Sequence, residues 1–452
     1  MSLRMQEQRT GAARSWVGRS ARIFLSPFGG SLGGGVLLTC LCVATQASAQ
    51  PSQGLTLSAF VEAVEAGNLE LRTQQLGVAQ VRAQVGVAQT FLDPSLSGGL
   101  YSLDVSGQGQ PTSVGAQLTV PLEGVGKRSH RIRAAQADVQ VAQLQLQDSA
   151  RTLRGRAAIA YIEALHMRLT YAQKQKTLES LEKLVRLNEL RLRAGDIGEV
   201  SLLQSQVEAQ QFKREVLGTR GELEAADAAL AQLLGRSQPE SAGPLVLQGD
   251  LRRALRSFEL SALLQSARQG RVDLRAQEKQ GEASGVRVEL AKRNRGIDVA
   301  MSLGWTRNLA TKAEAFAQPT NDTMSAQLSV PLPLSRIYHG ELAVMQAAQS
   351  QAQAQLSALE LKIETEVRQA LARYRAEAER VALYDNGVLA TADRVLTAIL
   401  YNYQRGGATL LEVLTAQRSA NEVYLTYYES LAETAKGLVE LELAAGLWDI
   451  EL

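Results

Sequence analysis

Few residues of this sequence are of types that do chemistry. It has only three histidines, and they lie far apart: His130, His166 and His339. Both cysteines, Cys40 and Cys42, fall within the first 50 residues, so the rest of the chain has no thiol. Zinc sites need clustered Cys and His ligands, and a cysteine nucleophile needs a thiol beside a base. We therefore expect no metal site and no cysteine-dependent catalysis in the body of the protein.

One segment, Gly124-Val125-Gly126-Lys127-Arg128-Ser129, superficially resembles a phosphate-binding loop. Pro121 stands where the first glycine of that motif belongs, and no second nucleotide-binding element is evident. Elsewhere the sequence places no nucleophile together with a base. We therefore expect neither an enzyme nor a bound cofactor.

The first 49 residues have the pattern of a secretory signal peptide. Five arginines open the chain, and a stretch of 13 apolar and glycine residues, 32–44, precedes Ala47-Ser48-Ala49, the small-x-small form that signal peptidase accepts. An N-terminal membrane anchor is the alternative, but a helix of this length reaches only about 20 Å. A lipid-anchored form needs a small residue before its cysteine, where Thr39 and Leu41 stand. We expect cleavage after Ala49.

Charge and composition exclude further classes of function. The 452 residues have 48 Lys and Arg against 46 Asp and Glu, and they are 45% hydrophobic with a mean hydropathy of −0.11. These values are typical of neither a disordered chain nor a polytopic helical membrane protein. Without residues 1–49 the chain has 43 basic and 45 acidic side chains. We therefore expect no nucleic-acid partner, since no basic stripe remains to bind phosphates.

The remaining chain contains two copies of one pattern. Matching segments recur at spacings of 203 to 213 residues: Leu57-Ser58-Ala59 with Leu260-Ser261-Ala262, Gln117–Leu122 with Gln327–Leu332, and Tyr161 and Tyr171 with Tyr374 and Tyr384. We expect a first repeat over 50–236, a linker rich in Pro and Gly over 237–257, a second repeat over 258–446, and a short C-terminal end over 447–452.

Each copy is predicted to contain long helices, because proline is absent from 122–238 and after Pro333. In the first copy, apolar positions step by 3 and 4 in a coiled-coil pattern that includes Asn188. We expect helices over about 57–91, 126–193 and 200–234, and over about 259–293, 337–403 and 409–444. In each copy the combined length of the two shorter helices matches the length of the long one. A helix of that length extends about 100 Å, which favours a rod or a tube wall over a globular domain.

Between the first helix and the long helix of each copy, the apolar period changes from about 3.6 to 2. We expect strands over 96–105, 114–120, 299–306 and 324–330. The alternation has two explanations, a sheet half-buried on a soluble core or strands tilted across a membrane.

The second explanation agrees better with the rest of the pattern. Because the helices are expected to pair with one another, no second layer is left to cover the sheet. Strands in lipid must have every backbone group paired, and four strands cannot close a ring alone, since ordinary barrels have at least about eight. Several copies of the chain must then pool their hairpins, so we expect an oligomer.

Two short segments, Arg191-Leu192-Arg193-Ala194-Gly195 and Tyr403–Leu414, complete a resemblance. With the signal peptide and the duplicated order of helix, strand pair, long helix and helix, the chain resembles the TolC-like outer-membrane factor (outer membrane efflux protein) family of Gram-negative bacteria. The resemblance implies a mainly α fold with a small β part. Duplicated long antiparallel helical hairpins and four transmembrane β-strands per chain would close as a trimeric α/β barrel in the outer membrane, continued by a periplasmic tunnel.

The resemblance also implies partners and a passive role. The partners are two further copies in a homotrimer, a periplasmic adaptor (membrane fusion protein), the inner-membrane pump of the same export system and outer-membrane lipid. The protein would conduct substrates from the adaptor and pump through the periplasm and outer membrane. The cargo stays open, because exporters of metal ions, drugs, other small molecules and proteins share these features.

Functional residues follow from the same resemblance. The family closes its tunnel with a Tyr, an Arg and acidic residues near the second helix turn, and Tyr403 and Glu412 match the Tyr and the first acid. Ala408 stands in place of the Arg and Thr415 in place of the second acid, so the gate role extends to Tyr403 and Glu412 alone. The alternatives are that Glu412 complements a helix N-terminus and that Tyr403 belongs to a helix seam.

The helix turns are the expected contact site for the adaptor. The resemblance implies this role for residues of both turns: Gly195, Ile197, Gly198, Arg405, Gly406, Gly407 and Thr409. The glycines have a simpler alternative role, which is to permit positive φ where a helix ends. Rival interpretations of the whole chain are a periplasmic adaptor, which would carry one helical hairpin in a β-rich chain, and a soluble coiled-coil scaffold without a channel.

Overall fold

The computed structural model describes residues 54–102, 112–236, 245–309, 319–332 and 340–452. Over these residues the chain is mainly helical with one small antiparallel sheet, as predicted from the sequence. The expected signal peptide, both cysteines, His339 and residues 237–244 of the linker lie outside the described residues.

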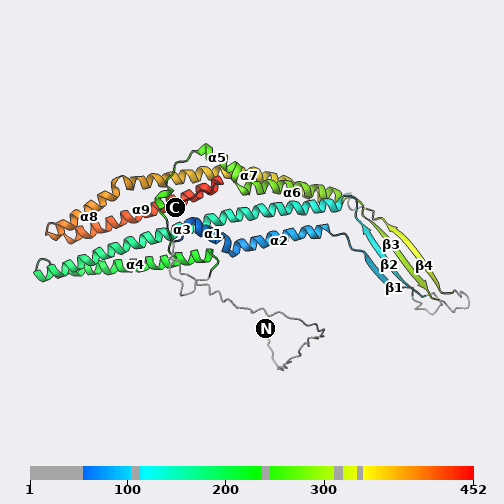
Figure 1. The fold of residues 1–452 in the computed structure, drawn as a ribbon, viewed down its shortest axis with the longest axis horizontal. Coiled ribbons are helices and arrows are strands. Elements are labelled where there is room, and N and C mark those ends of the chain that lie inside the picture. Colours follow the sequence, from blue (N-terminus) through cyan, green and yellow to red (C-terminus); the bar gives the residue numbers. More distant parts are fainter. Residues whose placement is uncertain (1–53, 103–111, 237–244, 310–318, 333–339) are drawn as a thin grey trace, which may run out of the picture. The chain divides into compact units, whose positions relative to one another are not determined.

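Helices and strands follow the same order in the two halves of the chain (Figure 1). The first half has α1 (Leu57–Gly67), α2 (Leu69–Gln89), β1 (Ser95–Ser102), β2 (Ser113–Leu122), α3 (Lys127–Ala194) and α4 (Glu199–Leu233). The second half has η1 (Leu251–Ala254), α5 (Leu260–Gly270), α6 (Val272–Asn294), β3 (Val299–Asn308), β4 (Asn321–Ser329), α7 (Gly340–Leu383), η3 (Tyr384–Val388), α8 (Leu389–Gln404) and α9 (Leu410–Ala445). Among the described helices, none combines the length and the apolar character that crossing a bilayer requires.

The first helix of each copy, predicted as continuous, is broken once. Asn68 separates α1 from α2 and Arg271 separates α5 from α6, both with φ of −70° and with ψ of 123° and 120°. Each break receives the last helix of its copy: Asn68 Nδ2 donates to Leu233 O at 3.0 Å, and Arg271 Nη1 donates to Ala444 O at 3.3 Å. The prediction of one helix was wrong because these contacts come from residues distant in sequence.

The two breaks differ in their chemistry. Asn68 is neutral, whereas the buried Arg271 forms ion pairs of 2.5 Å with Asp273 and 2.6 Å with Glu366. The backbones approach closely at the second break, because a Cβ on Gly446 would lie 2.9 Å from Arg271 N. Gly446 also has a φ of 68°, which favours glycine.

The second long helix, predicted over 337–403, is also interrupted. The π-helical segment η3 separates α7 from α8, and within it Gly387 has a φ of 128°. The hydroxyl of Tyr427 on α9 donates to Asp385 Oδ1 at 3.0 Å, so α9 contacts the interruption directly. Continuity was the wrong prediction, because it treated proline as the only breaker, whereas Gly also favours non-helical backbone.

Two tyrosines at equivalent positions of the two copies form hydrogen bonds with the backbone of segments that connect the helices. Tyr161 on α3 is fully buried, and its hydroxyl lies 2.6 Å from the carbonyl oxygens of both Leu55 and Gln248. Tyr374 on α7 is 2% exposed; its hydroxyl accepts from Arg256 N at 2.6 Å and donates to Ala254 O at 2.8 Å. Because an unpaired buried hydroxyl is costly, these bonds fix the path of the chain.

The four strands form one antiparallel sheet in the order β1-β2-β3-β4. All four lie where the sequence predicted strands, and residues 103–105 of the first predicted strand lie outside the described residues. The central pair, β2 and β3, joins the two copies, with Leu118 opposite Leu303 and Ala116 opposite Trp305. The sheet is therefore one unit to which each copy contributes a pair.

One face of this sheet is apolar, apart from the ion pair of Arg307 and Asp322 at the end away from the helices, and the other is polar. Residues that pair across strands share a face, and side chains alternate along each strand. One face carries Leu96, Leu118, Leu303, Ala116, Trp305, Met324, Val120, Met301 and Leu328. The other carries Ser95, Thr119, Ser302, Gln327, Ser97, Gln117 and Ser325. Leu96, Met324 and Leu328 are 77%, 86% and 65% exposed, so the apolar face is open.

Candidate functional site

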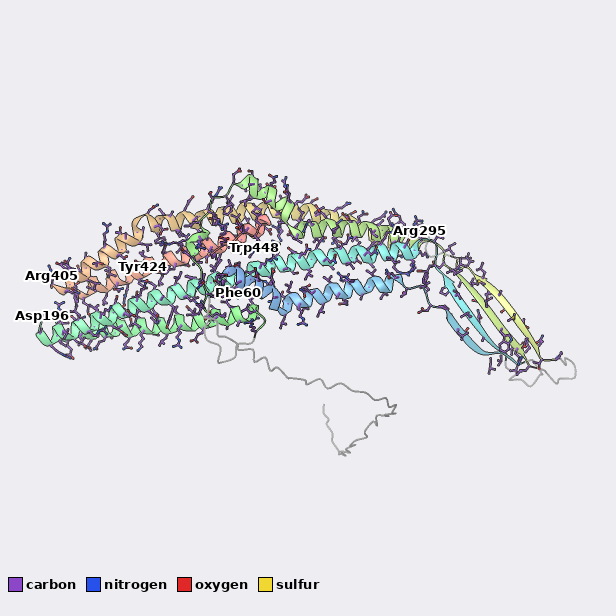
Figure 2. The ribbon with its side chains drawn as sticks, viewed as in Figure 1. Phe60, Asp196, Arg295, Arg405, Tyr424 and Trp448 are labelled. Carbon is purple, nitrogen blue, oxygen red and sulfur yellow. The ribbon has the colours of Figure 1, made fainter. Side chains whose placement is uncertain are left out.

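Two helix turns lie together at the end of the helices away from the sheet, marked by Asp196 on one and Arg405 on the other (Figure 2). The first turn ends α3 at Gly195, whose φ of 82° lets Asp196 N donate back to Arg191 O at 2.9 Å. Gly198 precedes α4, and Ile197 between them is half-buried.

The second turn joins α8 to α9. Gly406 has a φ of 79°, and Gly407 N donates to Asn402 O at 2.9 Å. Arg405 is exposed, with its guanidinium 4.0 Å from the ring centroid of Tyr401. The predicted tip residues of both turns are therefore solvent-accessible in the single chain, apart from the half-buried Ile197.

Glu412 is the acidic member of a capping box at the start of α9. Thr409 N donates to Glu412 Oε2 at 2.6 Å, and Glu412 N donates to Thr409 Oγ1 at 3.3 Å. The hydrogen bond from the Thr409 backbone, followed by that from its hydroxyl, lowers the pKa of the Glu412 carboxyl. The carboxylate is therefore ionised at neutral pH, and it stabilises the helix N-terminus as the alternative interpretation expected.

Tyr403 lies inside the protein, 3% exposed, and joins the two helix pairs. Its hydroxyl donates to Oδ1 of the fully buried Asn188 on α3 at 2.6 Å. Arg191, also on α3, donates from Nη1 to Tyr403 O at 3.0 Å, and its guanidinium lies 4.8 Å from the Tyr403 ring centroid. Residues of α3 thus hold the hydroxyl, the ring and the backbone of Tyr403.

Asn188 depends on this contact. Among the described residues, its Nδ2 has no hydrogen-bond partner, so the bond from Tyr403 is the one that its side chain makes. Asn188 was predicted to lie in the helix seam and Arg191 in a signature segment, but neither was assigned to the gate. The signal that could have identified Asn188 is a polar residue within an apolar seam.

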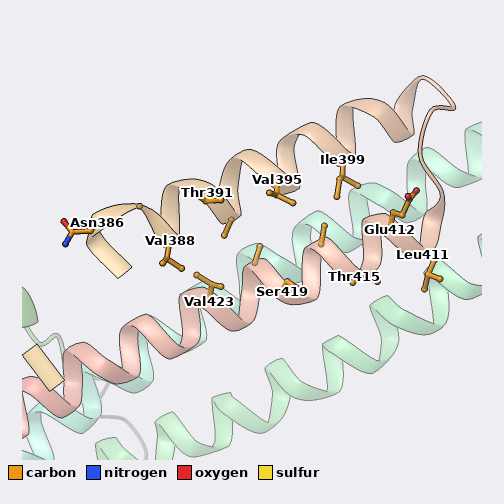
Figure 3. Close-up of a pocket in the computed structure, with 14 residues that line it drawn as sticks. Asn386, Val388, Thr391, Val395, Ile399, Leu411, Glu412, Thr415, Ser419 and Val423 are labelled. Atoms are coloured by element: carbon orange, nitrogen blue, oxygen red, sulfur yellow. The ribbon is translucent and has the colours of Figure 1, made fainter. Parts of the chain in front are cut away.

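A groove of about 870 Å³ separates α8 from α9 above the second turn (Figure 3). Its walls are mostly apolar, with Val395 and Ile399 on α8 and Leu411 on α9, and Glu412 lies at one end. Thr415, which stands in place of the family's second acid, also lines the groove. The structure thus brings Glu412 and Thr415 to one groove, whereas Tyr403 packs towards α3.

Across the described residues, no group of three or more His, Cys, Asp or Glu side chains is arranged to hold a metal ion. One ion pair between helices lies near this end, that of Arg418 on α9 with Glu208 on α4. The chemistry of this end of the molecule is therefore packing and hydrogen bonding between helices.

Comparison with known proteins gives matches over most of the chain. Residues 61–236 match the family model described as outer membrane efflux protein. CzcC of Cupriavidus metallidurans, named a cobalt-zinc-cadmium resistance protein, is 23% identical over 333 residues, which are 73% of this chain and 76% of CzcC.

Solved structures share the fold. A structure of CusC superposes with a TM-score of 0.67 at 18% identity, covering 89% of this chain and 96% of CusC. The outer membrane protein VceC of Vibrio cholerae superposes with a TM-score of 0.66 at 20% identity, covering 86% of this chain and 96% of VceC.

Proposed function

From the match of residues 61–236 to the outer membrane efflux protein family model, we propose that this chain is the exit duct of a tripartite export system. In this role it passively conducts substrates from a periplasmic adaptor and an inner-membrane pump across the periplasm and the outer membrane. The observation that carries the proposal is the sheet, which has one apolar and one polar face and whose apolar residues Leu96, Met324 and Leu328 are exposed.

The need to pair every backbone N–H and C=O group in lipid supports a homotrimer. β1 and β4 are the outer strands of the four-stranded sheet, and among the described residues of one chain each has an edge without a partner strand. In lipid such edges must be paired, and four strands are too few to close. Three copies would contribute twelve strands, with apolar faces towards lipid and polar faces towards the channel.

The helices support the tunnel. α3 has 68 residues and extends about 100 Å at 1.5 Å per residue. In this proposal three copies of α3, α4 and α7 to α9 form the periplasmic wall, and the two helix turns form its tip. The alternative function of a periplasmic adaptor agrees less well with this structure. An adaptor would carry one helical hairpin in a β-rich chain, whereas both halves of this chain carry a long hairpin.

Membrane insertion of the sheet can be tested with two matched variants on β2. Leu118→Arg places a charge on the apolar face, which costs about 2–4 kcal/mol at the bilayer midplane, whereas the adjacent Gln117→Arg places it on the polar face. We expect the wild type and Gln117→Arg in outer-membrane fractions as a heat-sensitive trimer, with Leu118→Arg depleted. Recovery of the wild type as a monomer in the soluble periplasm would refute the exit duct.

The gate role of Tyr403 and Glu412 is part of the proposal. Tyr403 would keep α8 against α3 when the tip is closed, and a ring of three Glu412 carboxylates would attract cations. Glu412→Gln removes the charge but retains a side chain that completes the capping box, whereas Glu412→Ala removes both. We expect Glu412→Gln to lower cation selectivity in planar bilayers without lowering thermal stability. Unchanged selectivity would remove Glu412 from the gate.

Adaptor contact is proposed for the tip residues Gly195, Ile197, Gly198, Arg405, Gly406, Gly407 and Thr409. Photo-crosslinkers at Ile197, Arg405 or Thr409 should capture a co-expressed adaptor. A crosslinker at Met324, which is 86% exposed on the sheet, is the matched control and should not. Capture from Met324 alone would contradict the assignment.

A further inference from the structure

Cations gather where the helices meet the sheet. The segments 89–94, 122–133 and 289–298, here called the basic junction, contain seven Lys and Arg side chains against four carboxylates. Arg295 marks this place in Figure 2. Residues 50–452 as a whole have slightly more acidic than basic side chains, so the basic junction is a local concentration of positive charge.

Three of the seven cations are neutralised by ion pairs. The pairs are Lys127 with Asp298 at 2.6 Å, Arg131 with Glu123 at 2.5 Å and Lys292 with Glu289 at 2.6 Å.

The other four, Arg128, Arg133, Arg293 and Arg295, have no carboxylate within ion-pair distance among the described residues. Arg128 instead donates to Gln89 O at 2.9 and 2.7 Å. The junction therefore retains positive charge that the described carboxylates do not neutralise.

These cations come from two helices and form one cluster. Arg133 lies 2.9 Å from His130 Nε2 on α3. Burial lowers the pKa of His130, Arg133 and then Arg293 on α6 lower it further, and Glu289 on α6 raises it. Because α6 packs against α3, charges from both helices act on this one ring. The helix dipole favours Arg293 and Arg295 at the end of α6 but disfavours Arg128 in the first turn of α3, so an anion would complement the cluster.

Exposed apolar side chains border the cluster. Phe91 is 72% exposed and Val125 98% exposed, and Ile297 beside Arg295 is 44% exposed. The Arg128 guanidinium lies 4.2 Å from the Phe91 ring centroid. An apolar surface that is bordered by aromatic and cationic side chains is typical of a protein at a membrane–water interface.

We propose that the basic junction binds the phosphate headgroups of anionic phospholipids in the leaflet that faces the periplasm. This inference rests on the proposed function, because it requires the apolar face of the sheet to be in lipid. The apolar row of Val120, Met301 and Leu328 lies near the helix ends of the strands, so a lipid with its headgroup at the junction would lay its chains along this face. Trp305 lies four residues beyond Met301, about 13 Å along β3, within reach of those chains.

Quenching of Trp305 fluorescence can measure which lipid binds at the junction. Trp448→Phe leaves it as the only tryptophan after residues 1–49, since Trp16 lies before that point. The mature protein with this change, without residues 1–49 and reconstituted in bilayers, is titrated with brominated phosphatidylglycerol or brominated phosphatidylcholine, which quench tryptophan on contact. With about 1 kcal/mol per cation near the surface, we expect roughly a fivefold or greater preference for the anionic lipid, decreasing as salt rises.

Charge variants assign the preference to the junction. Arg293→Gln with Arg295→Gln should reduce it to about twofold or less. Arg293→Lys with Arg295→Lys should retain it. Lys213→Gln with Arg214→Gln, which removes two exposed charges on α4, is the matched control and should also retain it.

The outcomes separate the two hypotheses. Equal quenching of Trp305 by both lipids in the chain with native arginines would overturn the lipid-binding junction and leave the exit duct intact. Absence of quenching by either lipid would instead contradict immersion of the sheet, and with it the proposed function.

Discussion

Tyr403→Phe removes a single hydroxyl from the buried contact between α8 and α3. That hydroxyl donates to Asn188 Oδ1 at 2.6 Å, and the two side chains are 3% and 0% exposed. The contacts of Arg191 with the Tyr403 ring and backbone are unaffected by the change, so the phenyl ring is expected to keep its place. The substitution therefore isolates one hydrogen bond.

The magnitude follows from burial. A neutral hydrogen bond contributes about 1 kcal/mol net, and removing one partner so that a buried acceptor is left unpaired costs about 1–3 kcal/mol in all. Among the described residues the side chain of Asn188 makes no other hydrogen bond, so a loss of about 1–2 kcal/mol, within that range, is expected. If the contact exists only when the tip is closed, the ratio of closed to open channels falls roughly 5- to 30-fold, since 1.4 kcal/mol is a factor of ten.

The assay is the open probability of single channels in planar bilayers. Tyr401→Phe is the matched control, because Tyr401 is exposed and lies two residues away on the same helix. Asn188→Ala and the double variant complete a cycle whose coupling energy reports the bond itself. An open probability for Tyr403→Phe equal to that of Tyr401→Phe and the wild type would refute the reasoning.

Two further predictions concern stability and titration. Gly446→Ala should lower the free energy of unfolding by about 2–4 kcal/mol, because alanine disfavours the φ of 68° and its Cβ would contact the second helix break. Gly221→Ala, in open space on α4, is the control and should be neutral or stabilising. Equal denaturation midpoints for the two variants would contradict this prediction. Burial, and a bond donated to Asp393, raise the pKa of Tyr424 to about 12. The folded state should thus lose stability as pH rises from 10 to 12. Absorbance titration should show a late tyrosinate transition whose amplitude is smaller in Tyr424→Phe, since other buried tyrosines also have a raised pKa; an unchanged amplitude would argue against it.

Local patterns predicted the strands and the first long helix well. Alternation alone located β2, and a proline-free apolar repeat gave α3 to within a residue or two at each end. The breaks at Asn68 and Arg271 were missed because each is stabilised by a carbonyl of a helix that ends more than 160 residues later. The resemblance to the efflux family was confirmed by the family match, and the trimer stays a prediction.

The candidate site was harder to predict than the fold. Glu412 was expected either in a gate or at a helix N-terminus, and its capping role depends on Thr409 only three residues away. The partners of Tyr403 lie on another helix, with Asn188 215 positions away, so periodicity could not connect them. Contacts within one turn of helix follow from sequence, whereas contacts between hairpins require the packed structure.

The unlike chemistry of Asn68 and Arg271 has a consequence for how a duplicated chain avoids misassembly. Two long helices of similar pattern compete for equivalent places, and at the repeat spacing of 213 Leu153 is the counterpart of Glu366. If α3 occupied the place of α7, Arg271 would lose one of its two carboxylate partners and remain buried, which is strongly unfavourable. A single charged position, Glu366, thus distinguishes α7 from α3, the other long helix of similar pattern, during assembly.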